Sequence, residues 1–273
     1  MRLVPVPAKI NLALVVGPRR EDGLHPVSTV LQRVDLCDWI GVETSRRLRL
    51  DGFRGDTLVR SALARLAEAA GVEARWRVRL VKRIPLAAGL GGGSADAAAA
   101  LRLANDLLPD PLAAGELREV AAEIGADVPF FLEPGTKLAE GAGELLEPLD
   151  LPQDFWVVVA LPWGTSKRST ADVYERFDDL GGGADFDSRR EALRRAVRAC
   201  RRPRELAALP ANDLLEPAGR PALVDELLSA GAFRADVSGS GPAVYALFHR
   251  RDEARAALRR SHPARGWVVP AVW

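Results

Sequence analysis

A cluster of glycines at residues 89–93 constrains the fold of this chain more than any other feature. Four of these five residues are glycine, and Ser94 and an alanine-rich segment follow directly. Glycines let the backbone turn and approach a ligand closely because they have no Cβ. The preceding segment 75–80 alternates polar and apolar residues, which predicts a strand, and the alanine-rich segment predicts a helix. A glycine loop that leads into a helix N-terminus favours anions, so the segment predicts a phosphate-binding site.

Two familiar phosphate-binding motifs do not fit this loop. A P-loop ends in Gly-Lys-Ser/Thr, whereas residues 93–95 are Gly-Ser-Ala. A dinucleotide-binding fingerprint has a glycine at its sixth position, where this chain has Ser94, and an acid on a second strand about 20 residues later, where it has Asp110 between two prolines. A flexible linker is the plain alternative. The second triple glycine, at residues 181–183, is flanked by acids and fits an ordinary surface loop better.

The composition limits the classes of protein to which the chain can belong. Its 273 residues are 48% hydrophobic and 27% charged, with a net charge of +1, which is typical of a soluble globular protein. We therefore expect no nucleic-acid partner and no membrane partner. The arginines of segment 189–204 are interpreted as the solvated face of an amphipathic helix, because apolar residues recur there at helical spacing. Two distant cysteines and the lack of a secretory signal or long apolar span predict a cytoplasmic protein.

A coarse pass along the chain predicts mixed α and β structure. Strands are expected over 10–16, 38–43, 75–80, 156–161, 243–248 and 267–272. Helices are expected over 57–70, 94–107, 112–124, 170–177, 190–201, 223–229 and 252–260. Prolines near residue 150 suggest a boundary between a domain of residues 1–150 and one of residues 151–273.

Three other segments carry residues that purely structural roles do not explain well. Lys9 and Asn11 lie two apart in an apolar strand, which places both on one face. Asp127 stands at a helix end before an apolar run, and Ser238–Pro242 is a second loop of small residues before a strand. Taken singly, each fits a solvent-facing pair or a plain turn. Taken together, a phosphate loop, a lysine, a carboxylate and a second glycine-serine loop are the parts required for phosphoryl transfer.

On these motifs the chain resembles the GHMP small-molecule kinases. The segments 7–12, 89–98, 125–131 and 238–242 occur in the order seen in that family, and the resemblance extends from about residue 3 to the C-terminus. Within the family it is strongest to the branch that phosphorylates a cytidine-diphosphate-linked methylerythritol. The turn 22–25, the run 125–131 and the segment 212–217 single out that branch.

The resemblance implies an α+β, two-domain GHMP kinase fold. It consists of an ATP-binding, ribosomal-protein-S5-like N-terminal α/β domain and a ferredoxin-like C-terminal α/β domain, with the active site in the cleft between them. It implies ATP and Mg²⁺ as cofactors, with no metal ligand assigned, and a small-molecule substrate. The oligomeric state is left open between monomer and homodimer. Asp127 would be the general base toward the substrate's 2-hydroxyl, and Lys9 would lie beside it, keeping it ionised and steadying the hydroxyl.

The same resemblance implies which residues bind the two substrates. The ATP phosphates would be wrapped by the loop residues Pro85, Leu86, Ala87, Ala88, Gly89, Leu90, Gly91, Gly92, Gly93, Ser94 and Ala95. The cytidine-linked substrate would contact residues from several segments, namely Asn11, Leu24, His25, Thr170, Tyr174, Ser238, Gly239, Ser240 and Gly241. His25 would hydrogen-bond the edge of the base, and Tyr174 would stack on it.

The chain departs from the family pattern at two places. Leu24 stands where the family usually has a tyrosine that stacks on cytosine, so we expect the base to be held largely from the Tyr174 side. Ala87 and Ala88 stand where glycines are common, and we expect ordinary negative φ at both because alanine is strained at positive φ. The remaining alternatives are a homoserine- or mevalonate-type GHMP kinase and a non-catalytic nucleotide-binding regulator. A nicotinamide oxidoreductase is disfavoured by Ser94 at the sixth position of the fingerprint.

Overall fold

The computed structural model describes residues 1–53, 55, 57–164 and 169–272. The chain forms two compact units, each made of several segments. Unit 1 comprises Met1–Ala8, Leu36–Leu86 and Gly91–Pro134, and unit 2 comprises Lys9–Asp35, Ala87–Leu90 and Gly135–Trp273. Two long strands, β1 (Val4–Val16) and β2 (Val27–Thr44), contribute residues to both units. The glycine loop likewise divides between Leu90 and Gly91.

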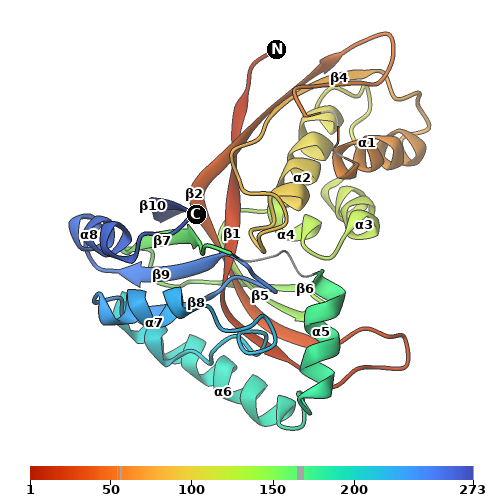
Figure 1. Cartoon of the computed structure of the whole chain (residues 1–273). Coiled ribbons are helices and arrows are strands. Elements are labelled where there is room, and N and C mark those ends of the chain that lie inside the picture. Colours follow the sequence, from red (N-terminus) through yellow and green to blue (C-terminus); the bar gives the residue numbers. More distant parts are fainter. Residues whose placement is uncertain (54, 56, 165–168, 273) are drawn as a thin grey trace. The chain divides into compact units, whose positions relative to one another are not determined.

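Unit 1 packs helices against a small sheet. Its strands follow the order β3-β4-β2, with β3 (Arg49–Asp51) parallel to β4 (Trp76–Val81) and β4 antiparallel to β2. Its helices are α1 (Leu58–Ala69), α2 (Gly92–Asn105), α3 (Ala114–Ile124) and α4 (Val128–Leu132), which gather together in Figure 1. Burial alternates along β4, as its sequence predicts, because Trp76, Val78 and Leu80 face the core.

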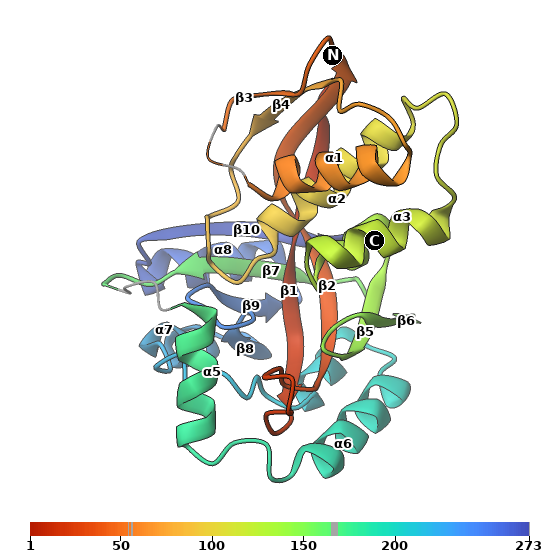
Figure 2. The same cartoon turned by 90° about the vertical axis from the view of Figure 1, so that its right-hand side faces the viewer.

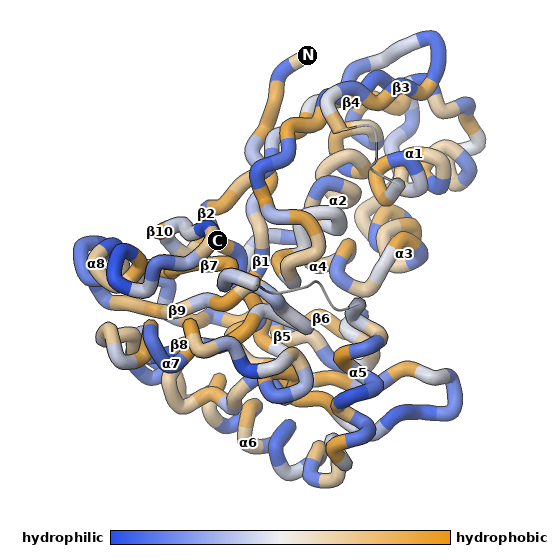
Figure 3. Tube along the Cα trace, viewed as in Figure 1, coloured by the Kyte–Doolittle hydropathy of each residue, from blue (hydrophilic) through white to orange (hydrophobic). Residues whose placement is uncertain are grey.

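Unit 2 is built on an antiparallel sheet. Its strands run in the order β2-β10-β7-β9-β8, and β5 and β6 extend from β2. Their bounds are β5 (Thr136–Gly141), β6 (Leu145–Leu149), β7 (Trp156–Leu161), β8 (Arg234–Val237), β9 (Val244–Phe248) and β10 (Arg265–Val272). Helices α7 (Ala222–Ser229) and α8 (Arg251–Ser261) pack on β7, β8 and β9. Much of α8 is hydrophilic in Figure 3, which fits its two buried residues, Ala254 and Ala257.

Two further helices of unit 2 follow the sheet strand β7. They are α5 (Thr170–Asp179) and α6 (Phe186–Ala199), and a short 3₁₀ helix spans Pro203–Ala208. Figure 2 shows α5 beside the end of β1, where Val173 and Phe177 pack in one apolar cluster with Leu14 and Val16. Ser169 caps α5, since its Oγ accepts from the backbone N–H of Asp172 at 3.0 Å.

Most predicted elements are confirmed to within a few residues, but several strands were missed. The prediction of a strand over 38–43 alone was wrong at its N-terminal side, because β2 begins at Val27. Residues 27–34 are buried throughout, so they lack the alternation that marks a half-exposed strand. The strands β3, β5, β6 and β8 were also missed, because runs of three to six residues are too short to show a clear alternation. Among the described residues, no helix is both long enough and apolar enough to cross a membrane.

Candidate functional site

Three of the predicted motifs meet inside unit 2. The backbone N–H of Lys9 donates to the carbonyl of Leu90 at 3.0 Å, which ties β1 to the glycine loop. The backbone N–H of Ala243 donates to the carbonyl of Ala88 at 3.1 Å. The Ser238 hydroxyl donates to the carbonyl of Gly89 at 2.8 Å. The first part of the glycine loop is therefore held between β1 and the segment that precedes β9.

Gly89 allows the closest of these approaches. Its φ is +79°, in the left-handed region, and a Cβ built on it would lie 2.0 Å from the carbonyl oxygen of Ser238. No side chain fits at that distance, and the conformation itself disfavours any residue other than glycine. The glycine at position 89 is thus required by contact with the Ser238 segment, independently of any ligand.

Lys9 and Asn11 share one face of β1, as the spacing predicts, and that face is buried. Their exposed fractions are 5% and 4%. The Lys9 Nζ donates to Asn11 Oδ1 at 2.7 Å, and Asn11 Nδ2 donates to the Thr29 hydroxyl at 2.9 Å. A solvent-facing pair is therefore excluded. Burying an ammonium is costly, and the hydrogen bond to Asn11 offsets part of that cost.

The expectation of ordinary φ at Ala87 was wrong. Ala87 has a φ of +51°, whereas Ala88 is not among the residues with positive φ. The physical reason is tertiary: hydrogen bonds to Ala88 and Gly89 fix where the chain passes, and the residue before them must turn to reach that path. An alanine in the left-handed region costs about 1–2 kcal/mol, which those contacts outweigh.

The second part of the loop opens helix α2 in unit 1. Gly91 is its N-cap residue with a φ of +67°, and Gly92, Gly93 and Ser94 form its first turn. These residues are half-exposed, so the unpaired N–H groups of the helix start remain accessible. This is the arrangement that the sequence predicts for binding phosphate.

A buried ion cluster at the same helix was not predicted. Lys82, at the end of β4, donates to the carboxylates of both Asp38 and Asp96, at 2.5 Å to Asp96 Oδ2. Asp38 also accepts from the backbone N–H of Ile84 at 2.9 Å. Burial acts to lower the pKa of Lys82, but the two carboxylates outweigh it and raise the pKa. A lone aspartate in an alanine-rich helix, Asp96, was the available signal for this cluster.

Asp127 lies in unit 1, between α3 and α4. It is the N-cap residue of α4 and is half-buried, with the buried residues Val128, Pro129 and Phe130 directly after it. The Asp127 carboxylate therefore lies in partly dry surroundings, as its position before an apolar run indicates. Lys9, in contrast, belongs to unit 2.

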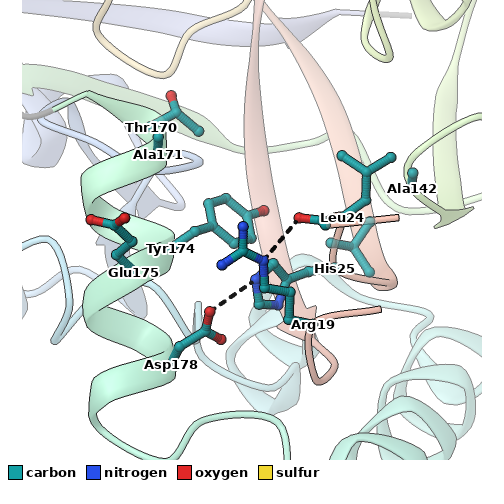
Figure 4. Close-up of a pocket in the computed structure, with 11 residues that line it drawn as sticks. Arg19, Leu24, His25, Ala142, Thr170, Ala171, Tyr174, Glu175 and Asp178 are labelled. Carbon is teal, nitrogen blue, oxygen red and sulfur yellow. Dashed lines mark hydrogen bonds and ion pairs between the residues drawn. The ribbon is translucent and has the colours of Figure 1, made fainter. Parts of the chain in front are cut away.

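Four of the residues predicted to contact the cytidine-linked substrate line one pocket of unit 2, whereas Asn11 and the Ser238–Gly241 loop are not among its lining residues. It has a volume of about 380 Å³, and Leu24, His25, Thr170 and Tyr174 are among its lining residues. The rings of His25 and Tyr174 lie 5.0 Å apart, centroid to centroid, and Leu24 is 52% exposed. Figure 4 shows Tyr174 projecting from α5 toward His25.

The second loop of small residues connects to this pocket through α5. The hydroxyls of Thr170 and Ser240 are 3.2 Å apart, and the backbone N–H of Gly241 donates to the Ser238 carbonyl at 2.9 Å. A Cβ at Gly239 would lie 3.5 Å from Asn11 Oδ1, in ordinary contact. In unit 2 the predicted substrate residues of β1, α5 and the 238–241 loop are therefore neighbours.

Comparison with known proteins agrees with this geometry. Residues 57–135 match the model of the GHMP kinase N-terminal domain, and residues 215–263 match that of the GHMP kinase C-terminal domain. A 4-diphosphocytidyl-2-C-methyl-D-erythritol kinase of Geobacter metallireducens is 38% identical over 279 residues, covering 97% of this chain and 96% of the relative. One of Anaeromyxobacter dehalogenans is 40% identical, covering 94% of this chain and 84% of the relative. The chain belongs to this family of GHMP kinases.

Solved structures place the GHMP kinase fold on the whole chain. A crystal structure of 4-(cytidine 5'-diphospho)-2C-methyl-D-erythritol kinase superposes with a TM-score of 0.81 at 35% identity, with 100% of both chains covered. A mevalonate kinase superposes with a TM-score of 0.73 at 12% identity, which shows a shared fold alone. The predicted two-domain α+β fold of this family is thus confirmed.

Proposed function

We propose that the chain is an ATP-dependent kinase that phosphorylates the 2-hydroxyl of 4-diphosphocytidyl-2-C-methyl-D-erythritol, in isoprenoid precursor synthesis. The observation that carries the proposal is the similarity of nearly the full chain to kinases of that name. The pocket around His25 and Tyr174 supports it, because an aromatic ring and a polar ring edge suit a pyrimidine base.

In this proposal Asp127 is the general base and Lys9 the assisting cation. Phosphoryl transfer depends mainly on positioning and on electrostatic stabilisation, with a carboxylate orienting the attacking hydroxyl. The buried Lys9–Asn11 pair supports a fixed ammonium at the substrate. The glycine loop and the start of α2 would hold the ATP phosphates.

Mg²⁺ is proposed as the partner of ATP, sharing the charge of its phosphates. Such an ion is usually held by phosphate oxygens and waters with one or two protein ligands. In the described ranges no group of three or more His, Cys, Asp or Glu side chains is placed to hold a metal ion. No protein ligand is assigned to it. We also propose that the domain boundary lies near residue 150; the two matched regions lie on either side of it.

The substrate is tested by ADP release with three alcohols side by side: the CDP-linked methylerythritol, homoserine and mevalonate. Release with the CDP-linked alcohol alone is expected. ADP release with homoserine or mevalonate alone would assign the chain to another GHMP kinase activity. No ADP release with any of the three alcohols would favour a nucleotide-binding regulator.

The base is tested by Asp127→Asn, with Asp110→Asn as a matched control. Asp110 is an exposed aspartate of the same unit. Loss of a general base costs about 10²–10⁴-fold in turnover, so Asp127→Asn should abolish ADP release while ATP affinity stays nearly unchanged. A parallel loss of ATP affinity would instead place Asp127 at the nucleotide.

A further inference from the structure

The pocket of unit 2 contains an acidic group that the sequence did not single out. Asp178 lies one helical turn after Tyr174 on α5, so both side chains project from one face of the helix. Figure 4 shows Tyr174 and Asp178 turned toward His25, whereas Glu175 is on another side of α5. The Asp178 carboxylate is 32% exposed and lines the pocket.

The proton on His25 can be assigned from its contacts. Its Nδ1 lies 2.9 Å from the carbonyl oxygen of Gly17. A carbonyl oxygen only accepts, so Nδ1 carries the hydrogen, and in the neutral ring Nε2 is an acceptor. Nε2 is the ring atom that faces Asp178, at 3.5 Å from Oδ2.

When His25 is neutral, two acceptors therefore stand side by side in this pocket, whereas a protonated His25 would form an ion pair with Asp178. Within the part of the chain that the structure describes, the Asp178 side chain accepts no hydrogen bond, and its contact with Nε2 is longer than a hydrogen bond. Arg19, which also lines the pocket, uses its Nε to donate to the carbonyl of Gly23 at 3.3 Å. A ligand group with two hydrogens would satisfy both acceptors at once.

We infer that Asp178 is a specificity-determining residue that reads the exocyclic amino group of the base together with His25. The inference rests on the proposed function and deepens it. A cytosine amino group carries two hydrogens, one for each acceptor, when the ring stacks on Tyr174. Uracil has an oxo oxygen at the same position, which would be a third acceptor facing a carboxylate. The pair thus selects an amino pyrimidine and rejects an oxo pyrimidine.

Nucleotide binding tests this without turnover. Affinities of CDP and UDP are measured by calorimetry for the wild type, Asp178→Asn, Asp178→Ala and, as a matched control, Asp179→Asn, at an exposed residue of α5 that is not among the lining residues of the pocket. A hydrogen bond to an ionised acceptor corresponds to roughly 10- to 100-fold in affinity, so the wild type should prefer CDP by at least that factor. Asp179→Asn, the same carboxylate-to-amide change on the same helix, should keep this preference.

The two Asp178 variants should differ from each other in one respect. Asp178→Asn can turn its amide to donate to an oxo oxygen, so CDP binding should weaken and UDP binding should strengthen. Asp178→Ala should weaken CDP binding with no gain for UDP. Equal weakening of both nucleotides, or a preference unchanged by Asp178→Asn, would mean that Asp178 only supports the fold and would overturn the inference.

The outcome is separable from that of the proposed function. A wild type that phosphorylates the CDP-linked alcohol but binds CDP and UDP equally, or neither, overturns the role of Asp178 alone. A wild type that prefers CDP through Asp178 but releases no ADP with that alcohol overturns the proposed function alone.

Discussion

The replacement of Gly89 by alanine perturbs the contact between the glycine loop and the Ser238 segment. Gly89 has a φ of +79°, and a Cβ there would lie 2.0 Å from the Ser238 carbonyl oxygen. Gly181, in the second triple glycine of the chain and in the same unit, is a matched control. Its φ is +69°, and nothing lies within 4 Å of the position of its Cβ.

The two substitutions share a conformational cost and differ in a steric one. An alanine in the left-handed region costs about 1–2 kcal/mol, and the reduced freedom of the unfolded chain returns about 0.4–1 kcal/mol. At Gly89 the loop must also move away from the Ser238 segment. That movement breaks the hydrogen bonds from Ser238 to Gly89 and from Ala243 to Ala88, each worth about 1 kcal/mol. Gly89→Ala should therefore lower the free energy of unfolding by about 2 kcal/mol more than Gly181→Ala.

Urea unfolding of the two variants and the wild type measures this difference. The midpoints and slopes are compared at one pH, since a change in slope would show that the cooperativity of unfolding has changed. Gly89→Ala should also weaken ATP binding, whereas Gly181→Ala should not. Equal destabilisation by both substitutions would refute the steric argument, because only the shared conformational cost would then be present.

Three other predictions concern buried charge and backbone conformation. Burial acts to raise the pKa of Glu140, but hydrogen bonds from two arginines of α6 lower it from 4.5 to about 2. The ionised carboxylate therefore contributes its full stabilisation above about pH 4.5, and this contribution is lost as the pH falls toward 2. Glu140→Gln should lower the free energy of unfolding by about 1–3 kcal/mol at pH 7. Urea unfolding at several pH values should show that the difference from the wild type vanishes toward pH 2. Lys82→Met leaves two buried carboxylates without their cation and should cost about 3–5 kcal/mol in urea unfolding, and adding Asp96→Asn should recover part of it. Ala87→Gly relieves a positive φ and should not lower the melting temperature, whereas Ala88→Gly should lower it; the same sign for both would contradict the strain assigned to Ala87.

Sequence patterns predicted much of the fold because the signals are local. The alternation of β4 and the alanine-rich α2 lead to a strand, a loop and a helix without knowledge of the rest of the chain. The buried part of β2 and the short strands around it were missed because strands of this kind have no period of their own. Their identity depends on the neighbours that cover them.

The candidate site divides in the same way. Lys9, Asn11 and Asp127 were found because charged or polar groups in apolar segments are conspicuous in a sequence. Lys82 and Asp178 were not, since a lysine after a strand and an aspartate on a helix are ordinary until their neighbours are known. The sequence predicted a negative φ for Ala87, and the structure has a positive one, for a related reason. Alanine's intrinsic preference is local, whereas the hydrogen bonds that override it come from distant residues.

The glycine cluster separates what the residue types determine from what only the folded chain determines. Its residue types alone required a tight loop before a helix and a surface suited to phosphate, because both follow from the missing Cβ and from the helix dipole. That Gly89 must be glycine because Ser238 lies against it could come only from the folded chain, which brings together residues about 150 positions apart. Conformational freedom is a property of a residue, whereas proximity between distant segments is a property of the packed fold.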